Sequence, residues 1–251
     1  YAKHEFSTIR NCRSFMGGHF SNRTPSFLMV PLRIWLGIAW LFEGIMKIVE
    51  GWFGKAMLTD FFNGANSWYN GLLKGAVDGA TQATGKAAAD AVSSATGAAQ
   101  SAGTVIWNFR FIRLFRVYFV SGKSLAESTF ADYAFKLDVP FVNWIINRLV
   151  LPFHGMQMFM QIAIVIAEIL IGVELIGGIF TTLGAAVSLA LEVMFVCSTG
   201  LYLNTFWMIF GAIALLIGGG RTFGFDYAFM PWLKEHWKKL PFVRRLYIYN
   251  D

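Results

Sequence analysis

The segment 27–49, FLMVPLRIWLGIAWLFEGIMKIV, constrains this chain more than any other stretch. At about 1.5 Å of rise per residue, a helix of this length reaches across the roughly 30 Å hydrocarbon core of a bilayer. Yet the segment carries Arg33, Glu43 and Lys47. Each of these charges costs about 2.5–3.5 kcal/mol at the centre of a membrane helix. The fold must therefore hide these side chains from lipid.

The polar residues of this segment fall on one side of the predicted helix. At 3.6 residues per turn a single stripe contains Arg33, Gly37, Trp40, Gly44 and Lys47. Glu43 lies one turn before Lys47, at a spacing that allows an ion pair. A stripe of this kind must face other helices or water, so the remaining sequence has to supply its partners.

The composition is that of an integral membrane protein. Of the 251 residues, 56% are hydrophobic and 14% are charged, whereas soluble domains average about 25% charged residues. The aromatic content of 17% is typical of lipid-facing surfaces and interfacial belts. The net charge of +6 comes from basic residues that flank apolar segments. Membrane orientation and anionic headgroups explain that charge, and we expect no nucleic-acid partner.

Three further crossings are predicted after the first. Residues 155–177 form one apolar segment, and residues 181–219, whose only charge is Glu192, are long enough for two more. The sequence therefore predicts an all-α membrane protein: a four-transmembrane-helix bundle with a long extracytoplasmic arm containing interfacial helices.

The predicted organisation has five parts. They are a basic cytoplasmic juxtamembrane segment (1–26), the first transmembrane helix (27–50), an extracytoplasmic arm (51–152), transmembrane helices two to four (153–220) and a basic cytoplasmic tail (221–251). The Lys/Arg excess at both ends predicts cytoplasmic termini.

Three features are predicted within the arm. Its Ala/Gly-rich middle predicts a weak amphipathic helix or a mobile arm. Arg110, Arg113 and Arg116, at steps of three among aromatics, predict a helix lying in the membrane plane. Residues 140–151 predict a short apolar helix that cannot cross.

Ionisable groups from three of the predicted crossings should meet in the bundle interior. On the second crossing Glu168 shares a face with Gln157 and Gln161, and on the third Glu192 follows Gly184 and Ser188 at steps of four. The candidates are Arg33, Glu43, Lys47, Glu168 and Glu192. Two interpretations stay open: a buried polar network that fixes helix register, or a site that handles quinone or protons.

No motif in the chain supplies a complete active site. There is no GxGxxG, no P-loop and no nucleophile with a base at a recognisable spacing. Cys12 and Cys197 stand far apart and give no metal-ligand spacing. We therefore expect no metal, and no cofactor bound by this chain alone.

Three stretches carry a resemblance to a known family. They are PLRIWLGIAWLFEGIMKI with the following Gly51-Trp52, then AEILIGVELIGGIFTTLGAAVSLALE, then GGGRTFGFD, whose Arg221 and Asp226 close the predicted fourth helix. Together they cover about half of the chain, which on this basis resembles the DoxX-like family of small membrane proteins. Residues 55–140 do not match the family's minimal pattern.

The resemblance implies a function in membrane-bound electron transfer. It implies an integral module of a quinone-linked respiratory oxidoreductase, of NADH or thiosulfate type, in a bacterial or archaeal cell membrane. Quinone would be the substrate, and FAD would sit on a flavoprotein domain or subunit. Other membrane subunits or further copies of the chain are additional partners. The basic stretch RNCRSFMGGHFSNRTPSFLMVPLR resembles a junction to a type II NADH dehydrogenase-like flavoprotein.

Two other functions remain open from the sequence. One is a membrane anchor or assembly scaffold with no ligand or catalysis of its own. The other is a small transporter, for which four helices without an inverted repeat give thin support.

Overall fold

The computed structural model describes only part of the chain. The residues described are 29–84, 103–111, 114–216, 223–226, 228–229, 232 and 236. They divide into two compact units. Unit 1 draws on residues 1–47, 165–190 and 208–251, and unit 2 on residues 48–164 and 191–207. The predicted basic segment 1–26 lies outside the described residues, and so do Arg113 and Arg221.

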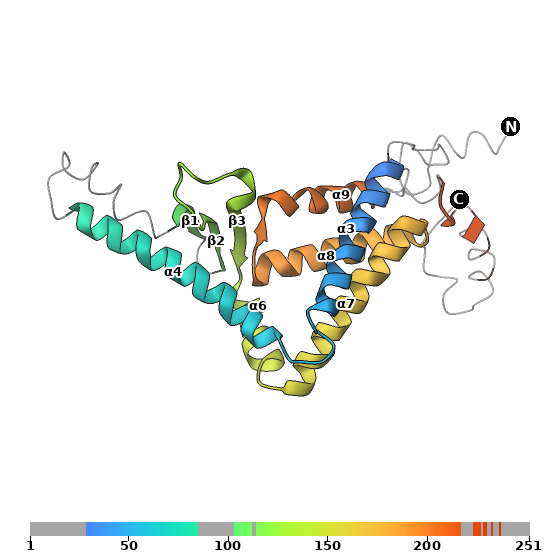
Figure 1. Cartoon of the computed structure of the whole chain (residues 1–251), viewed down its shortest axis with the longest axis horizontal. Helices are drawn as coiled ribbons and strands as arrows, with labels where there is room; N and C mark the ends of the chain where they lie inside the picture. The colour runs from blue at the N-terminus through green and yellow to red at the C-terminus, as the bar shows by residue number, and fades with distance from the viewer. Residues whose placement is uncertain are drawn as a thin grey trace. The chain divides into compact units, whose positions relative to one another are not determined.

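Unit 1 is built on two long helices that lie side by side, α3 (Met29–Val49) and α7 (His154–Gly177) (Figure 1). Glycines bring the two backbones together. A Cβ on Gly172 would stand 2.8 Å from the backbone nitrogen of Leu41 and 3.0 Å from the carbonyl oxygen of Gly37. Contacts this close exclude any larger side chain at Gly172 and are typical of helices packed through small residues.

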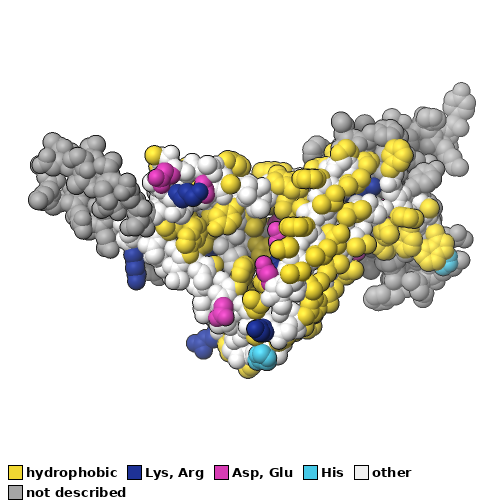
Figure 2. All heavy atoms as spheres, in the orientation of Figure 1, with side chains coloured by type: hydrophobic (Ala, Val, Ile, Leu, Met, Phe, Trp, Pro, Cys, Tyr) yellow, Lys and Arg dark blue, Asp and Glu magenta, His cyan; other side chains and the backbone are white. Residues whose placement is uncertain are grey.

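The outer faces of these helices are apolar. Trp35 and Phe42 on α3, and Leu170 and Val173 on α7, are exposed. Figure 2 shows hydrophobic side chains gathered over this region. Exposed apolar patches mark surfaces that meet a membrane or another protein, so these faces are candidates for such contact.

Unit 2 contains a four-stranded antiparallel sheet in the order β1-β2-β3-β4. The strands are β1 (Thr104–Phe111), β2 (Phe115–Ser121), β3 (Tyr133–Asp138) and β4 (Leu201–Tyr202), with short 3-10 turns at Phe130–Asp132 and Leu203–Thr205. Helix α4 (Leu58–Thr84) packs on the sheet through Tyr69 and Leu72, which meet Tyr118, Val120 and Ala134. Aromatic and β-branched residues favour this pleated, half-buried surface.

The prediction of an all-α, four-crossing bundle is wrong. Besides the sheet, the described residues include two helices long and apolar enough to cross a membrane, α7 and α8 (Thr181–Ser198). Helix α9 (Trp207–Leu215) has nine residues, which is about 14 Å at 1.5 Å per residue and too short to cross. Hydropathy predicted two crossings within residues 181–219, but after α8 the chain forms β4 and a 3-10 turn before α9 begins.

The prediction of an interfacial helix around Arg110 and Arg116 is also wrong, because these residues lie on β1 and β2. The misleading signal was the spacing of three between arginines. Trp107, Phe109 and Phe111 alternate with Asn108 and Arg110, and a period of two with aromatics is the pattern of a strand.

Other segment predictions are confirmed. A short helix follows β3, as α6 (Pro140–Ile145) and a π-helical turn, η2 (Ile146–Val150). Helix α7 ends at Gly177 and α8 begins at Thr181, so a turn of three residues joins them.

Candidate functional site

The predicted polar stripe of α3 is buried. Arg33, Gly37, Trp40 and Gly44 all lie in the interior of unit 1. The Trp40 indole Nε1 donates to Ser188 Oγ of α8 at 2.7 Å. Ser188 and Gly184 are buried as the spacing of four on α8 predicted. The stripe therefore faces helices of its own unit.

Lys47 and Glu168 form an ion pair near the end of α3. Lys47 Nζ lies 2.5 Å from Glu168 Oε1, and the Glu168 side chain is 0% exposed, against 14% for Lys47. Glu43 Oε2 lies 3.9 Å from the same Lys47 Nζ, but its side chain is 57% exposed. The buried pair is thus Lys47–Glu168, and Glu43 borders it from the surface.

One oxygen of this pair carries no hydrogen bond. Glu168 Oε2 is buried and has no hydrogen-bond partner among the described residues. An unmatched buried acceptor costs about 1–3 kcal/mol, so such atoms are uncommon unless they have a use. A buried carboxylate with one bonded and one unbonded oxygen can accept a proton or a hydrogen bond from a ligand.

Arg33 belongs to a different cluster, about 21 Å away along α3 at 1.5 Å per residue. Its Nη2 donates to the Phe223 carbonyl oxygen at 3.0 Å, and Asp226 is close enough to interact with it electrostatically. The structure therefore brings Arg33 together with Asp226, and Lys47 together with Glu168.

The Asp226 side chain caps the N-terminus of α8 from a distant part of the sequence. Its carboxylate accepts from the backbone N–H groups of Phe180 at 2.7 Å and Thr181 at 3.0 Å. A carboxylate at this position satisfies amides that have no partner within the helix and complements the helix dipole. The Asp226 N–H in turn donates to the Gly178 carbonyl oxygen at 2.8 Å.

The backbone around this cap is strained. Phe180 (φ 50°) and Phe223 (φ 49°) are non-glycine residues in the left-handed region, where a bulky side chain is costly. Each is held by the cluster, Phe180 through its N–H to Asp226 and Phe223 through its carbonyl to Arg33. At Gly178 a Cβ would stand 2.6 Å from Arg33 Nη1, so the guanidinium fits only against glycine.

Glu192 is buried as well, with 2% of the residue exposed, and lies in unit 2. Gln157 and Gln161, which the sequence placed on the Glu168 face of α7, are also buried in that unit. Gln161 donates to the carbonyl oxygens of Trp52 and Lys55 and accepts from the Met57 N–H. Gln161 thus fixes the turn between α3 and α4.

Sequence reasoning missed Lys136 of β3. The residue is 3% exposed, its Nζ donates to Asn66 Oδ1 at 2.8 Å, and it lies 5.0 Å from the centre of the Tyr69 ring. Burial lowers the pKa of Lys136, and nearby Asp138 partly offsets that change. Burial also raises the pKa of Tyr69. The only sequence signal was a lysine between two apolar residues of a short strand.

The described residues contain no group of three or more His, Cys, Asp or Glu side chains placed to hold a metal ion. The geometry leaves Lys47–Glu168 as the candidate site, with Arg33–Asp226 as a structural counterpart. A scan against protein-family models, a search of curated proteins and a search of solved structures each find no match to this chain.

Proposed function

We propose that this chain is a DoxX-like membrane module of a quinone-linked respiratory oxidoreductase, with the Lys47–Glu168 pair as its proton-handling site. The observation that carries the proposal is the burial of this ion pair, with an unbonded carboxylate oxygen, on two apolar helices. An ionisable residue within a membrane segment is a functional candidate by default, because its burial is so costly.

The chemistry of quinone reduction suits such a pair. A quinone that takes up two electrons also takes up two protons, and its carbonyl oxygens need hydrogen-bond donors. The Lys47 ammonium can donate to a carbonyl oxygen, and the Glu168 carboxyl can pass a proton. Electrons would come from FAD on a separate flavoprotein domain or subunit, because the sequence has no dinucleotide-binding fingerprint.

The proposed location is the cell membrane of a bacterium or archaeon. Helices α7 and α8 are each long and apolar enough to cross, and the short turn between them suits a helical hairpin. Lys and Arg are frequent in residues 1–26, so we place that end of the chain on the cytoplasmic side. A flavoprotein would dock there, and other membrane subunits or further copies of the chain would surround the helices.

Replacing Glu168 with Gln tests this function. Membranes that carry the Glu168→Gln chain should retain its assembly but lose quinone reduction by about 100-fold, the usual scale for a lost acid–base group. The matched control is Glu174→Gln on the same helix, which removes a half-buried carboxyl outside the pair. Unchanged turnover in Glu168→Gln, with normal assembly, would contradict the proposal.

A scaffold without catalysis is the second candidate. It is favoured by the Arg33–Asp226 cluster, where two buried charges are accounted for by a helix cap and a backbone carbonyl. The same experiment separates the two functions. A scaffold would lose partner assembly when the helix contacts are disturbed and would be indifferent to the charge of Glu168.

A further inference from the structure

One end of the sheet in unit 2 gathers two segments that are distant in the sequence. Arg110 of β1 pairs with Arg116 of β2, and Arg116 pairs with Asp138 at the end of β3. Two residues later the chain enters α6. The register therefore places the β1–β2 turn and α6 at the same end, which we call the hairpin end.

The hairpin end exposes large apolar side chains. They are Phe111 and Leu114 at the turn, Phe141 and Trp144 on α6, and Leu149 on η2. The rings stack in pairs, Phe111 on Phe115 at 5.2 Å between centroids and Phe141 on Trp144 at 6.3 Å. Trp is one of the residues enriched where a protein meets the membrane interface, and the Phe rings add apolar area beside Trp144.

Cations surround this apolar surface. Arg110 and Arg148 are exposed, and Arg110 lies directly across the ladder from Arg116. Like charges in opposite positions on neighbouring strands destabilise a sheet. Asp138 is the described acid at this end and faces Arg116 through the ladder and through Tyr118. The surplus positive charge calls for an external anion.

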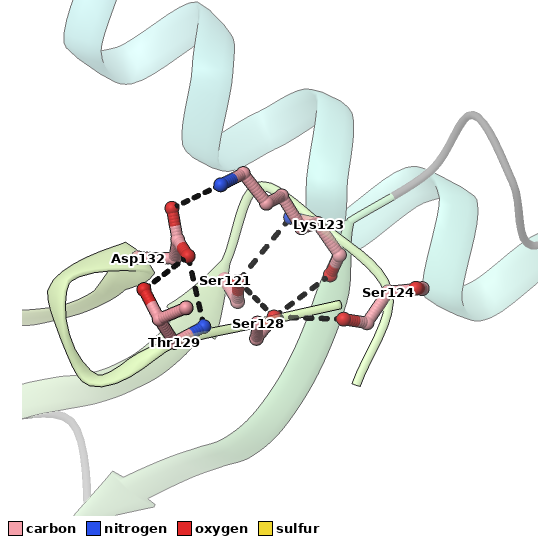
Figure 3. A network of polar contacts seen from close by, with 6 residues as sticks. All are labelled: Ser121, Lys123, Ser124, Ser128, Thr129 and Asp132. Atoms are coloured by element: carbon pink, nitrogen blue, oxygen red, sulfur yellow. Dashed lines mark hydrogen bonds and ion pairs between the residues drawn. The ribbon is translucent and has the colours of Figure 1, made fainter. Parts of the chain in front are cut away.

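The opposite end of the sheet is different in kind. There the loop from Ser121 to Asp132 is closed by its own polar contacts, shown in Figure 3. Ser128 Oγ lies 2.6 Å from Ser121 Oγ, and Lys123 Nζ lies 2.7 Å from Asp132 Oδ1. Its cation is already matched by an acid, so this end has no comparable need for a partner.

We propose that the hairpin end docks on the anionic lipid headgroups of the membrane that α7 crosses. The inference rests on the membrane placement of α7 in the proposed function but not on the redox chemistry. Helix α7 begins at His154, directly after α6 and η2, so the start of a membrane crossing adjoins this surface. The arginine guanidinium groups can bind the lipid phosphates, while the neighbouring aromatic rings contact the upper part of the acyl chains.

A fluorophore on the hairpin end tests the docking. In the full chain with Cys12→Ser and Cys197→Ala, a single cysteine carries bimane at Leu114→Cys or, as control, at Leu125→Cys. The two leucines are matched, with 66% and 64% exposed, and lie at opposite ends of the sheet. The vesicles contain phosphatidylcholine, with or without phosphatidylglycerol, and doxyl-labelled lipid as quencher.

The expected result is a difference between the two positions. In anionic vesicles doxyl lipid should quench bimane at position 114, and iodide should reach it several-fold less than at position 125. Arg110→Gln and Arg148→Gln should each lower the equilibrium constant for docking, the ratio of docked to undocked molecules, by about fivefold, from the usual contribution of one basic residue at an anionic surface. Lys123→Gln, at the opposite end, should leave it unchanged.

Two outcomes would overturn the proposal. One is equal access of iodide to positions 114 and 125. The other is shielding of position 114 that follows the protein-to-lipid ratio without doxyl quenching, which would mean that a second copy covers the surface. A label at Val173→Cys, an exposed position on α7, tests the membrane crossing independently of the docking. Quenching there without quenching at 114 would reject the docking alone, and no quenching at 173 would reject the crossing.

Discussion

The two ends of α3 bury charge in different ways. At one end Arg33 and Asp226 are engaged by backbone groups, the Phe223 carbonyl and the first amides of α8. At the other end Lys47 and Glu168 engage each other, and Glu168 Oε2 is left without a hydrogen bond among the described residues. The two ends therefore differ in the kind of partner. Backbone groups engage the charges at one end, and a second charged side chain engages them at the other.

The largest effect should follow from removing the cap. Asp226→Ala leaves the buried N–H groups of Phe180 and Thr181 without their acceptor, at about 1–3 kcal/mol for each. We expect unfolding in detergent, followed by circular dichroism, to show a loss of roughly 2–6 kcal/mol. Asp226→Asn keeps one acceptor oxygen and should lose about half as much. Equal stability of Asp226→Ala and the parent would contradict a structural role for the Arg33–Asp226 cluster.

Exchanging the other pair for apolar residues should have a smaller effect than breaking it. Glu168→Leu alone removes the buried partner of Lys47 and leaves the exposed Glu43 carboxylate at 3.9 Å, and we expect a loss of about 3 kcal/mol. The double variant Lys47→Met, Glu168→Leu should recover most of that loss, because well-packed apolar residues often replace a buried ion pair without cost. Recovered stability without quinone reduction would support a functional pair. A double variant as unstable as the single one would instead assign the pair to the fold.

The contact between the helices lies midway between the two clusters. Gly172→Ala places a Cβ against backbone atoms of Leu41 and Gly37, and overpacking of this kind costs about 1–3 kcal/mol. Gly71→Ala in α4 is the control, since nothing lies within 4 Å of its Cβ position. That variant should gain stability, because alanine favours helix by about 1 kcal/mol over glycine. Thermal unfolding of both variants checks the contrast, which fails if they shift in the same direction.

The smallest effect concerns an exposed ion pair, in contrast to the buried ones. Hydrogen bonds from Lys123 and from Thr129 lower the pKa of Asp132 to about 2, from an ordinary value of 3.8. A carboxyl with a lowered pKa in the folded state stabilises its loop above pH 3.8, and this contribution disappears as the pH falls towards 2. The protection of the Thr129 amide, the intrinsic exchange rate divided by the observed rate at the same pH, should therefore fall over that interval. In Asp132→Asn the protection should show no such step.

Periodicity predicted much of unit 1 and little of unit 2. The buried face of α3 followed from the 3.6-residue period, which holds whichever partner covers the stripe. On β1 a spacing of three between arginines competed with a spacing of two between aromatics, and the wrong period was chosen. Strand β4 has two residues and exists because it pairs with β3, so no local pattern marks it.

The candidate site was predicted as a set of residues but not as pairs. Burial cost singled out Arg33, Glu43, Lys47, Glu168 and Glu192. The structure buries Arg33, Glu168 and Glu192, leaves Lys47 partly buried and exposes Glu43. The capping by Asp226 spans 46 residues of sequence to Phe180, and no spacing rule reaches that far. The same holds for Lys136, whose partner Asn66 is 70 residues away.

The late position of Asp226 in the chain has a consequence for biosynthesis. The first turn of α8 leaves the ribosome some 45 residues before the carboxylate that closes it, and β3 similarly waits for β4. During that interval the nascent chain carries an unfinished helix end and an open strand edge, which are typical points of entry for aggregation and chaperone binding. A premature stop between residues 200 and 226 would leave this vulnerable intermediate as the final product.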